Sequence, residues 1–398
     1  MSPHPRDPGR RRDSDSSRSR RSWSHRWAAT LTTAALMAVS GCTSSVPDAT
    51  GLGGADVALY VTEFTNRRTS DGRVLLYDRQ GPVSQVAVTG VMNPGLVWDE
   101  SGLFFIDSQA DYQVSDRVER RVRSREAGLL AGMRGGRDGR RVVLFDDGVH
   151  DGRNHTGIGI YNGAREVSRQ LLLDGDGMGL ASCEHGLFVA GRAAREVGES
   201  SELVRLDPPG GGPPQRVGDP VPGTFLDGLD TPCRDDRVYG LWRPPGTGSS
   251  TTLEVWAWNT RDGSVRRTPL RDDTGTFSLS DDAVAGPSTL PRWLDGDDLV
   301  WVDNTGTGWR TDLATGRTTR IREGLICTGA PITNWARTGN WLVGFEYLGG
   351  YENAHLQIYS ASDLSLVETR ELPRLAELTP HDRMVLAIAV GPTFRPRT

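Results

Sequence analysis

The sequence predicts an all-β protein folded as a β-propeller, a ring of four-stranded sheets, and three observations lead to this prediction. A short apolar strand recurs after a polar turn, with spacings of 39, 45, 51, 61 and 43 residues between successive copies. Most copies are followed by a second pattern of strand, polar turn and strand. Beyond the amino-terminal segment, no long stretch has a convincing 3.6-residue apolar period. Repeats of this length with four short strands are typical of propeller blades.

The first element in chain order has the layout of an export signal. Residues 1–27 are rich in arginine and serine, and an apolar run at 27–39 follows them. This run is too short to anchor in a bilayer, which takes about 20 residues, and a positive segment before a short apolar one is typical of a signal peptide. Residues 19–23 (SRRSW) faintly resemble a twin-arginine signal, so both general and twin-arginine export remain open.

The residues after the apolar run, Ser40-Gly41-Cys42, resemble the lipobox of bacterial lipoproteins. The resemblance implies removal of residues 1–41, attachment of diacylglycerol to Cys42, and an anchored position at the outer side of the cytoplasmic membrane. An ordinary signal peptide with a chance cysteine is the alternative. Residues 42–53 are then the lipidated cysteine and a flexible tether.

Charge argues against nucleic acid as a partner. The chain has 46 basic and 51 acidic residues, and all of the basic residues are arginines. Removing residues 1–41 would take away 8 Arg and 3 Asp, which leaves 38 basic and 48 acidic residues and a net charge of about −10. A body this acidic would need a segregated basic face to bind nucleic acid.

Residues 54–398 are expected to form a single propeller domain. The recurring apolar strands lie at 102–107, 141–145, 186–191, 237–242, 298–303 and 341–347. Three strands at 57–88 lack an inner strand before them, and the strand at 384–390 (MVLAIAV) has no hairpin after it. We therefore expect the C-terminal strand to complete the first blade and close the ring. Seven blades are expected, with eight blades or two β-sandwich domains as alternatives. The pattern resembles bacterial YVTN/quinoprotein-like propellers, a likeness of architecture that implies no activity.

Connection length is unequal along each repeat. The turns before the apolar strands are short, as at 99–102 and 183–186, whereas the connections after these strands and between repeats are long. In a propeller these two long classes emerge on the same face. Since binding residues lie mostly in loops, this face is the expected recognition surface.

Three cysteines remain after Cys42. Cys183 and Cys233 occupy nearly equivalent places in neighbouring repeats, just before the short turn. In an oxidising, exported setting this placement predicts a Cys183–Cys233 disulfide across adjacent inner strands. Cys327 is expected to be a free, buried thiol, because no nearby histidine could activate it as a nucleophile.

The densest polar cluster predicts the one metal-site candidate. It contains the carboxylates and imidazoles that hold zinc or manganese, but its Asp-Gly pairs are also good turn formers. Its residues are Asp146, Asp147, His150, Asp151 and His155, together with Asn154. Glu352, Asn353 and His355 lie in a comparable loop and could join this site across the ring axis.

No GxSxG, HExxH or Walker A motif is present in the sequence, and no catalytic residue or resident cofactor is predicted. The tryptophans at 98, 242, 293, 301, 335 and 341 are interpreted as blade core. The sequence thus favours a membrane-anchored, non-catalytic propeller that binds an envelope protein or a small ligand. The alternatives are a metal-dependent hydrolase or lactonase and a metal-delivery protein.

Overall fold

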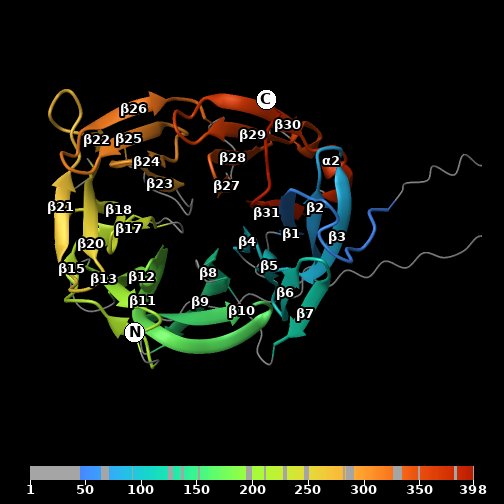
Figure 1. The fold of residues 1–398 in the computed structure, drawn as a ribbon, viewed down its shortest axis with the longest axis horizontal. Coiled ribbons are helices and arrows are strands. Elements are labelled where there is room, and N and C mark those ends of the chain that lie inside the picture. Colours follow the sequence, from blue (N-terminus) through green and yellow to red (C-terminus); the bar gives the residue numbers. More distant parts are fainter. Residues whose placement is uncertain are drawn as a thin grey trace, which may run out of the picture. The chain divides into compact units, whose positions relative to one another are not determined.

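Four-stranded antiparallel sheets repeat around a ring in the computed structural model (Figure 1). The chain divides into two units, Met1–Ser45 and Val46–Thr398, and the ring belongs to the second. The structure describes residues 45–63, 71–91, 93–123, 129–135, 139–150, 153–193, 200–209, 212–226, 231–245, 251–280, 283, 291–325, 334–347, 350–380 and 383–397. Among these residues, no helix is long and apolar enough to span a membrane.

The ring has seven blades, which confirms the favoured blade number. Strand order in each blade runs from the innermost strand outward. Blade 1 contains β31 (Arg383–Val390), β1 (Val57–Glu63), β2 (Asp71–Tyr77) and β3 (Pro82–Thr89). Blade 2 contains β4 (Leu96–Asp99), β5 (Gly102–Ile106), β6 (Ala110–Val114) and β7 (Val118–Val122). Blade 3 contains β8 (Leu129–Gly135), β9 (Arg140–His150), β10 (Arg153–Asn162) and the first half of β11 (Arg165–Cys183).

Blades 4 and 5 are less regular. Blade 4 contains the second half of β11, then β12 (Gly186–Ala193), β13 (Ser200–Arg205), β14 (Gln215–Arg216) and β15 (Val221–Pro222). Blade 5 contains β16 (Thr224–Phe225) and β17 (Cys233–Arg234), then β18 (Arg237–Arg243), β20 (Glu254–Asn259) and β21 (Val265–Pro269). A separate two-stranded sheet consists of β19 (Thr251–Thr252) and β22 (Ser278–Leu279).

Blades 6 and 7 return to the four-strand pattern. Blade 6 contains β23 (Arg292–Asp295), β24 (Asp298–Val302), β25 (Gly308–Asp312) and β26 (Thr318–Arg322). Blade 7 contains β27 (Asn334–Thr338), β28 (Trp341–Glu346), β29 (His355–Ser360) and β30 (Leu366–Glu371). Two short helices, η1 (Tyr351–Asn353) and α2 (Leu375–Leu378), lie in the connections before β29 and after β30.

The C-terminal strand closes the ring as the sequence predicts. β31 pairs antiparallel with β1, from Val57 opposite Val390 to Glu63 opposite Arg383, so the two ends of the domain share one sheet. The first residues of the domain are also bound to blade 1. The backbone N–H of Ala49 donates to the carbonyl of Gln85 at 2.7 Å. The unit that contains the ring therefore begins at Val46, inside the segment whose composition predicts a tether.

Aspartates stabilise the tight turns between outer strands. In the turn after β20, the Asp262 carboxylate accepts from the backbone N–H and hydroxyl of Ser264, and Asp363 does the same with Ser365 after β29. Hydrogen bonds lower the pKa of both carboxyl groups because they favour the charged form: those from Ser264 at Asp262, and those from Ser360 and then Ser365 at Asp363. Such turns explain why Asp and Gly recur between the predicted strands.

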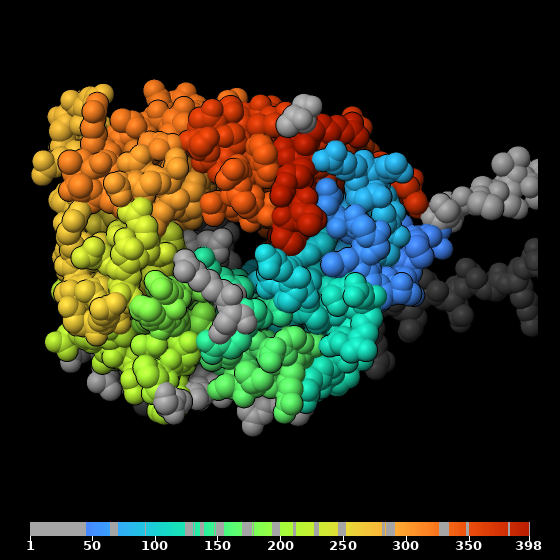
Figure 2. Space-filling view, in the orientation of Figure 1, coloured from blue at the N-terminus to red at the C-terminus, as the bar shows by residue number. Residues whose placement is uncertain are grey.

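The core lies in the seams between blades. Trp242, Trp256 and Trp258 are fully buried with Phe225 between blades 4 and 5, and Trp301 is buried between blades 5 and 6. The interpretation as blade core is confirmed for Trp242, Trp293 and Trp301, whereas Trp98, Trp335 and Trp341 pack against the core and are only partly buried. The Cys183–Cys233 disulfide, also confirmed, joins β11 to β17 at the inner edges of blades 4 and 5, with a Cα–Cα distance of 5.3 Å. Figure 2 shows a hollow near the centre of the ring, beside β31 and β4.

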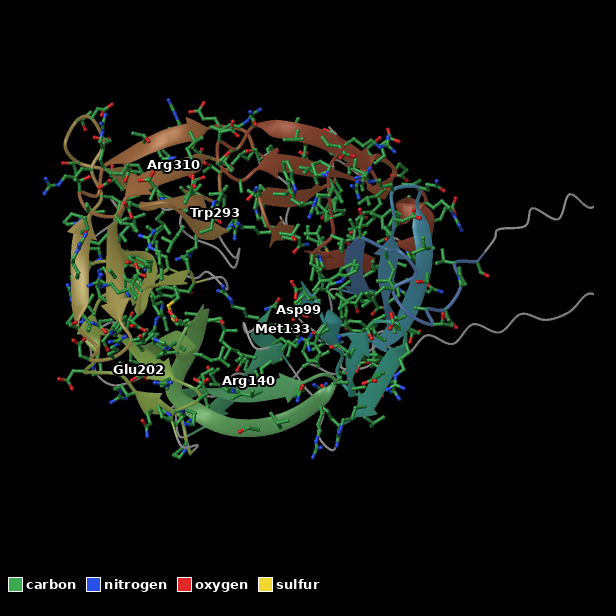
Figure 3. All side chains as sticks on the ribbon, in the orientation of Figure 1. Asp99, Met133, Arg140, Glu202, Trp293 and Arg310 are labelled. Atoms are coloured by element: carbon green, nitrogen blue, oxygen red, sulfur yellow. A yellow bond between two sulfur atoms is a disulfide. The ribbon has the colours of Figure 1, made fainter. Side chains whose placement is uncertain are left out.

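Arginine side chains connect neighbouring blades. Their long guanidinium-tipped side chains reach carboxylates on the next blade and can bind them through more than one N–H. Examples from separate seams are Arg141 with Asp99 at 2.8 Å, Arg140 with Asp207 at 2.9 Å, Arg234 with Asp297 at 3.0 Å, and Arg370 with Asp56 at 3.0 Å. Asp99 lies on an innermost strand and Arg140 further out, so the connections span the depth of the blades (Figure 3).

Candidate functional site

Strand order places the long connections at one end of the ring. The turns between first and second strands are short, as between β4 and β5 or between β23 and β24. Because neighbouring strands are antiparallel, the connection after the second strand and the entry to the next innermost strand lie at the opposite end. In blade 5 this end carries the extra pairing of β19 with β22. We call it the long-connection face.

Blade 3 extends furthest on this face. β9, β10 and β11 have 11, 10 and 19 residues, whereas the strands of blade 2 have four or five. β8 pairs with β9 only as far as Asp146, opposite Leu129. Beyond that point β9 and β10 continue as a hairpin to His150 and Arg153, with β11 beside it only as far as Asp174, opposite His155; we call this extension the blade 3 ribbon. β11 then runs on without a break to become the innermost strand of blade 4.

The predicted metal-site residues fall on the blade 3 ribbon. Asp146 is exposed, and its carboxylate accepts from the Gly148 N–H at 2.8 Å. His155 is half-buried. The register pairs His155 with Asp174, and Arg153 with His150. The side chains of Asp147 and His150 are not described, and Asp151 and Cys327 lie outside the described residues, so the metal site stays a prediction.

Elsewhere the described residues offer no set of three His, Cys, Asp or Glu side chains placed to hold a metal ion. His155 and His355, proposed to meet across the axis, lie on blades 3 and 7 at opposite sides of the ring (Figure 1). The two histidines therefore lie in separate blades, each with its own neighbouring residues.

His355 belongs to a polar cluster on blade 7. Its Nε2 lies 3.0 Å from Oε2 of Glu346, and the side-chain amide of Gln357 lies 3.0 Å from that same oxygen. Nδ1 lies 2.9 Å from the carbonyl oxygen of Asn353. Glu346 is buried, whereas the side chain of His355 is 19% exposed. Glu346 and Gln357 carry no motif, but their positions opposite and two residues beyond His355 follow from strand pairing.

A second buried polar cluster lies between blades 2 and 3. The Asp111 carboxylate binds Arg123 at 3.0 Å, and both side chains are almost inaccessible. Burial raises the pKa of Asp111 to about 7, against the opposing effect of Arg123, and the negative charges of Glu166 and Asp107 add to the rise. Asp107 accepts from the Tyr112 hydroxyl at 2.8 Å and from backbone N–H groups, including that of Thr89 in blade 1. The cluster holds three blades together.

No protein-family model matches the sequence, and no curated protein matches it. Solved structures do share the fold. A functionally unknown protein from Desulfotomaculum acetoxidans has a TM-score of 0.50 and 10% identity, and the match covers 84% of this chain and 99% of that one. The propeller domain of the Trilobed protease from Pyrococcus furiosus has a TM-score of 0.48 and 10% identity, with 83% and 98% covered. AztD from Citrobacter koseri has a TM-score of 0.42 and 10% identity, with 84% and 98% covered. At these identities the likeness concerns the fold alone, and this chain is a seven-bladed β-propeller.

Proposed function

We propose that this protein is an extracytoplasmic lipoprotein whose propeller acts as a non-catalytic binding scaffold for an envelope protein or a small ligand. The observation that carries the proposal is that most of the long connections lie at one end of the ring, whereas most turns at the other end are short. Variation in length at one end changes the presented surface without disturbing the packed seams. The long-connection face is the proposed binding surface.

Anchoring is the second part of the proposal. It rests on the Ser40-Gly41-Cys42 sequence after a short apolar run. A single modified cysteine would hold the ring at the outer side of the cytoplasmic membrane. Replacing Cys42 by Ala should move the exported protein from the membrane fraction to the soluble fraction. Identical fractionation of both proteins would refute the lipid anchor.

Site-specific photocrosslinking tests the binding surface. One photoreactive residue replaces Glu352, which is exposed in η1 on the long-connection face. The matched control replaces Glu100, which is exposed in the short turn between β4 and β5 at the other end. In intact cells we expect a discrete adduct from position 352 and none from position 100. Adducts from position 100 alone, or the same adducts from both positions, would contradict the proposal.

A metal-dependent enzyme or a metal-delivery protein is the second candidate. The observation in its favour is the register that pairs His155 with Asp174 and Arg153 with His150 on the blade 3 ribbon. A site filled at about 100 times its Kd adds roughly 2.7 kcal/mol to stability. Thermal melts before and after chelation, with zinc or manganese restored, should then differ in the native chain, and the difference should be clearly smaller in a His150→Ala/His155→Ala variant. Equal melts of the native chain in all conditions would remove this candidate.

A further inference from the structure

Three side-chain atoms at the blade 7 cluster form a nearly equilateral triangle. The corners are Nε2 of His355, Oε2 of Glu346 and the terminal amide nitrogen of Gln357, with sides of 3.0, 3.0 and 3.1 Å. Two ligands at right angles on a metal ion, with bonds near 2.1 Å, are also about 3.0 Å apart. The triangle therefore has the dimensions of one face of an octahedral coordination shell.

Two hydrogen-bonding arrangements can hold the triangle together while Glu346 is ionised. A carbonyl oxygen only accepts, so Nδ1 of His355 carries hydrogen toward Asn353. In the neutral ring Nε2 then has a lone pair, which faces the carboxylate oxygen of Glu346. A second proton on the ring would suit Glu346, but it would set Nε2–H against the N–H of Gln357. The neutral ring thus places two acceptors side by side, whereas the doubly protonated ring and Gln357 both donate to the same oxygen of Glu346.

A half-turn of the Gln357 amide gives the alternative arrangement that a bound cation would favour. The amide oxygen and nitrogen exchange places with no change of shape. The neighbouring Thr369 hydroxyl, 3.3 Å from the amide oxygen, can accept as well as donate. After this rotation three acceptors converge: an imidazole nitrogen, a carboxylate oxygen and an amide oxygen. This is a ligand set for a first-row divalent metal ion.

The backbone holds the three ligands in place. Glu346 and His355 are directly paired on β28 and β29, and Gln357 follows two residues later on the same side of β29. Val343, Phe345, Leu356 and Ile358, on the alternate positions, pack toward blade 1, so the three ligands face blade 6. The bond from Nδ1 to Asn353 fixes the ring orientation, as a backbone carbonyl commonly does behind a metal-binding histidine.

We propose that Glu346, His355 and Gln357 form a binding site for a six-coordinate, first-row divalent metal ion, of the class of Mn²⁺, at the long-connection end of blade 7. The three protein ligands occupy one face of the ion. The remaining positions take water or a donor atom from a bound molecule, and the exposed part of His355 gives access to them. The site is independent of the blade 3 ribbon and of the proposed scaffold function.

Metal titration of the purified full-length chain tests this site. After chelation and dialysis, Mn²⁺ is added, and the loss of its free-ion electron paramagnetic resonance signal measures binding, with Zn²⁺ as competitor. We expect about one equivalent to bind, and His355→Ala and Glu346→Gln to lose at least about tenfold in affinity. The matched control is Glu371→Gln, an exposed carboxylate paired with His355 on β30, which should bind as the native chain does.

Two further variants distinguish a loss of the blade 7 site from misfolding and from metal binding at the blade 3 ribbon. Gln357→Glu adds a charged ligand and should bind Mn²⁺ more tightly, an outcome that misfolding cannot produce. The His150→Ala/His155→Ala variant should bind Mn²⁺ at the blade 7 site unchanged, which separates this site from the blade 3 ribbon. Absence of Mn²⁺ and Zn²⁺ binding by the native chain, or native affinity in folded His355→Ala, would overturn the proposal.

Discussion

The buried Asp111 carboxylate predicts an unusual dependence of stability on pH. Asp111 is on β6, its partner Arg123 follows β7, and Glu166 contributes a negative charge from β11 in blade 3. Burial and the neighbouring carboxylates raise the pKa of Asp111 from its usual 3.8 to about 7. In the range between these two values the folded chain holds a proton that the unfolded chain has released.

The sign and size of the effect follow from this difference. A raised pKa in the folded state stabilises the fold at low pH, and this contribution is lost as pH rises from about 4 to about 7. One proton is worth 1.36 kcal/mol per pH unit, so the full difference is on the order of 4 kcal/mol, and more than half of it is lost between pH 5 and pH 8. The four turn aspartates with lowered pKa titrate below this window.

Urea unfolding at pH 5, 6, 7 and 8 measures this slope. The free energy of unfolding of the native chain should fall by roughly 2–3 kcal/mol more over this range than that of Asp111→Asn, which has no titrating group at this position. Glu166→Gln removes one of the charges that raise the pKa of Asp111 and should move the fall to lower pH. Equal slopes in the native chain and Asp111→Asn would show that Arg123 keeps Asp111 ionised and would refute the reasoning.

Two further predictions concern the ring itself. Cys183→Ala/Cys233→Ala opens a loop of 50 residues and should lower the free energy of unfolding by about 4 kcal/mol, measured by urea unfolding without reductant. Unchanged stability would mean that the loop is equally restrained in the unfolded chain. Arg370→Ala removes the ion-pair partner of Asp56 in the seam between blades 7 and 1, and should lower the free energy of unfolding by about 3–5 kcal/mol. The control is the exposed ion pair of Arg317 and Asp273, for which Arg317→Ala should lower the free energy of unfolding by less than about 1 kcal/mol. Equal losses in Arg370→Ala and Arg317→Ala would contradict the argument from burial.

The fold was predictable because its signals are local. The strands β5 and β24 lie where the apolar runs at 102–107 and 298–303 place them, and the short turns before them follow from Asp and Gly. Ring closure followed from counting strands at the two ends. The disulfide followed from the equivalent places of Cys183 and Cys233 in successive repeats. Each inference needed only neighbouring residues or the repeat period.

The continuous strand β11 shows where local signals mislead. Residues 175–177 (Gly-Asp-Gly) have the composition of a turn, yet the strand runs through them. The reason lies in another strand: the N–H of Gly177 donates to the Thr156 hydroxyl at 3.0 Å, and a Cβ at Gly177 would come within 3.1 Å of the Thr156 side chain. Glycine at this position permits close approach between strands, which a sequence cannot distinguish from a turn.

The blade 7 cluster was hidden for a related reason. Glu346 and His355 are nine residues apart, and only the length of the connection through η1 sets them opposite each other. A shift of one residue in this register would turn His355 and Gln357 toward the apolar seam with blade 1. Residues at ordinary strand positions thus become a polar site only through pairing.

The seams between blades and the long-connection face have different roles in this molecule. Arginine pairs, a disulfide and buried aromatic side chains hold each blade to the next. These contacts involve strands and short turns, so they place few demands on the connections at the other end. The blade 3 ribbon and the polar cluster of blade 7 both arise at that freer end, where strands lengthen or polar residues replace apolar ones. A rigid ring with one adaptable end suits binding, because the ligand-contacting groups are held in place before the ligand arrives.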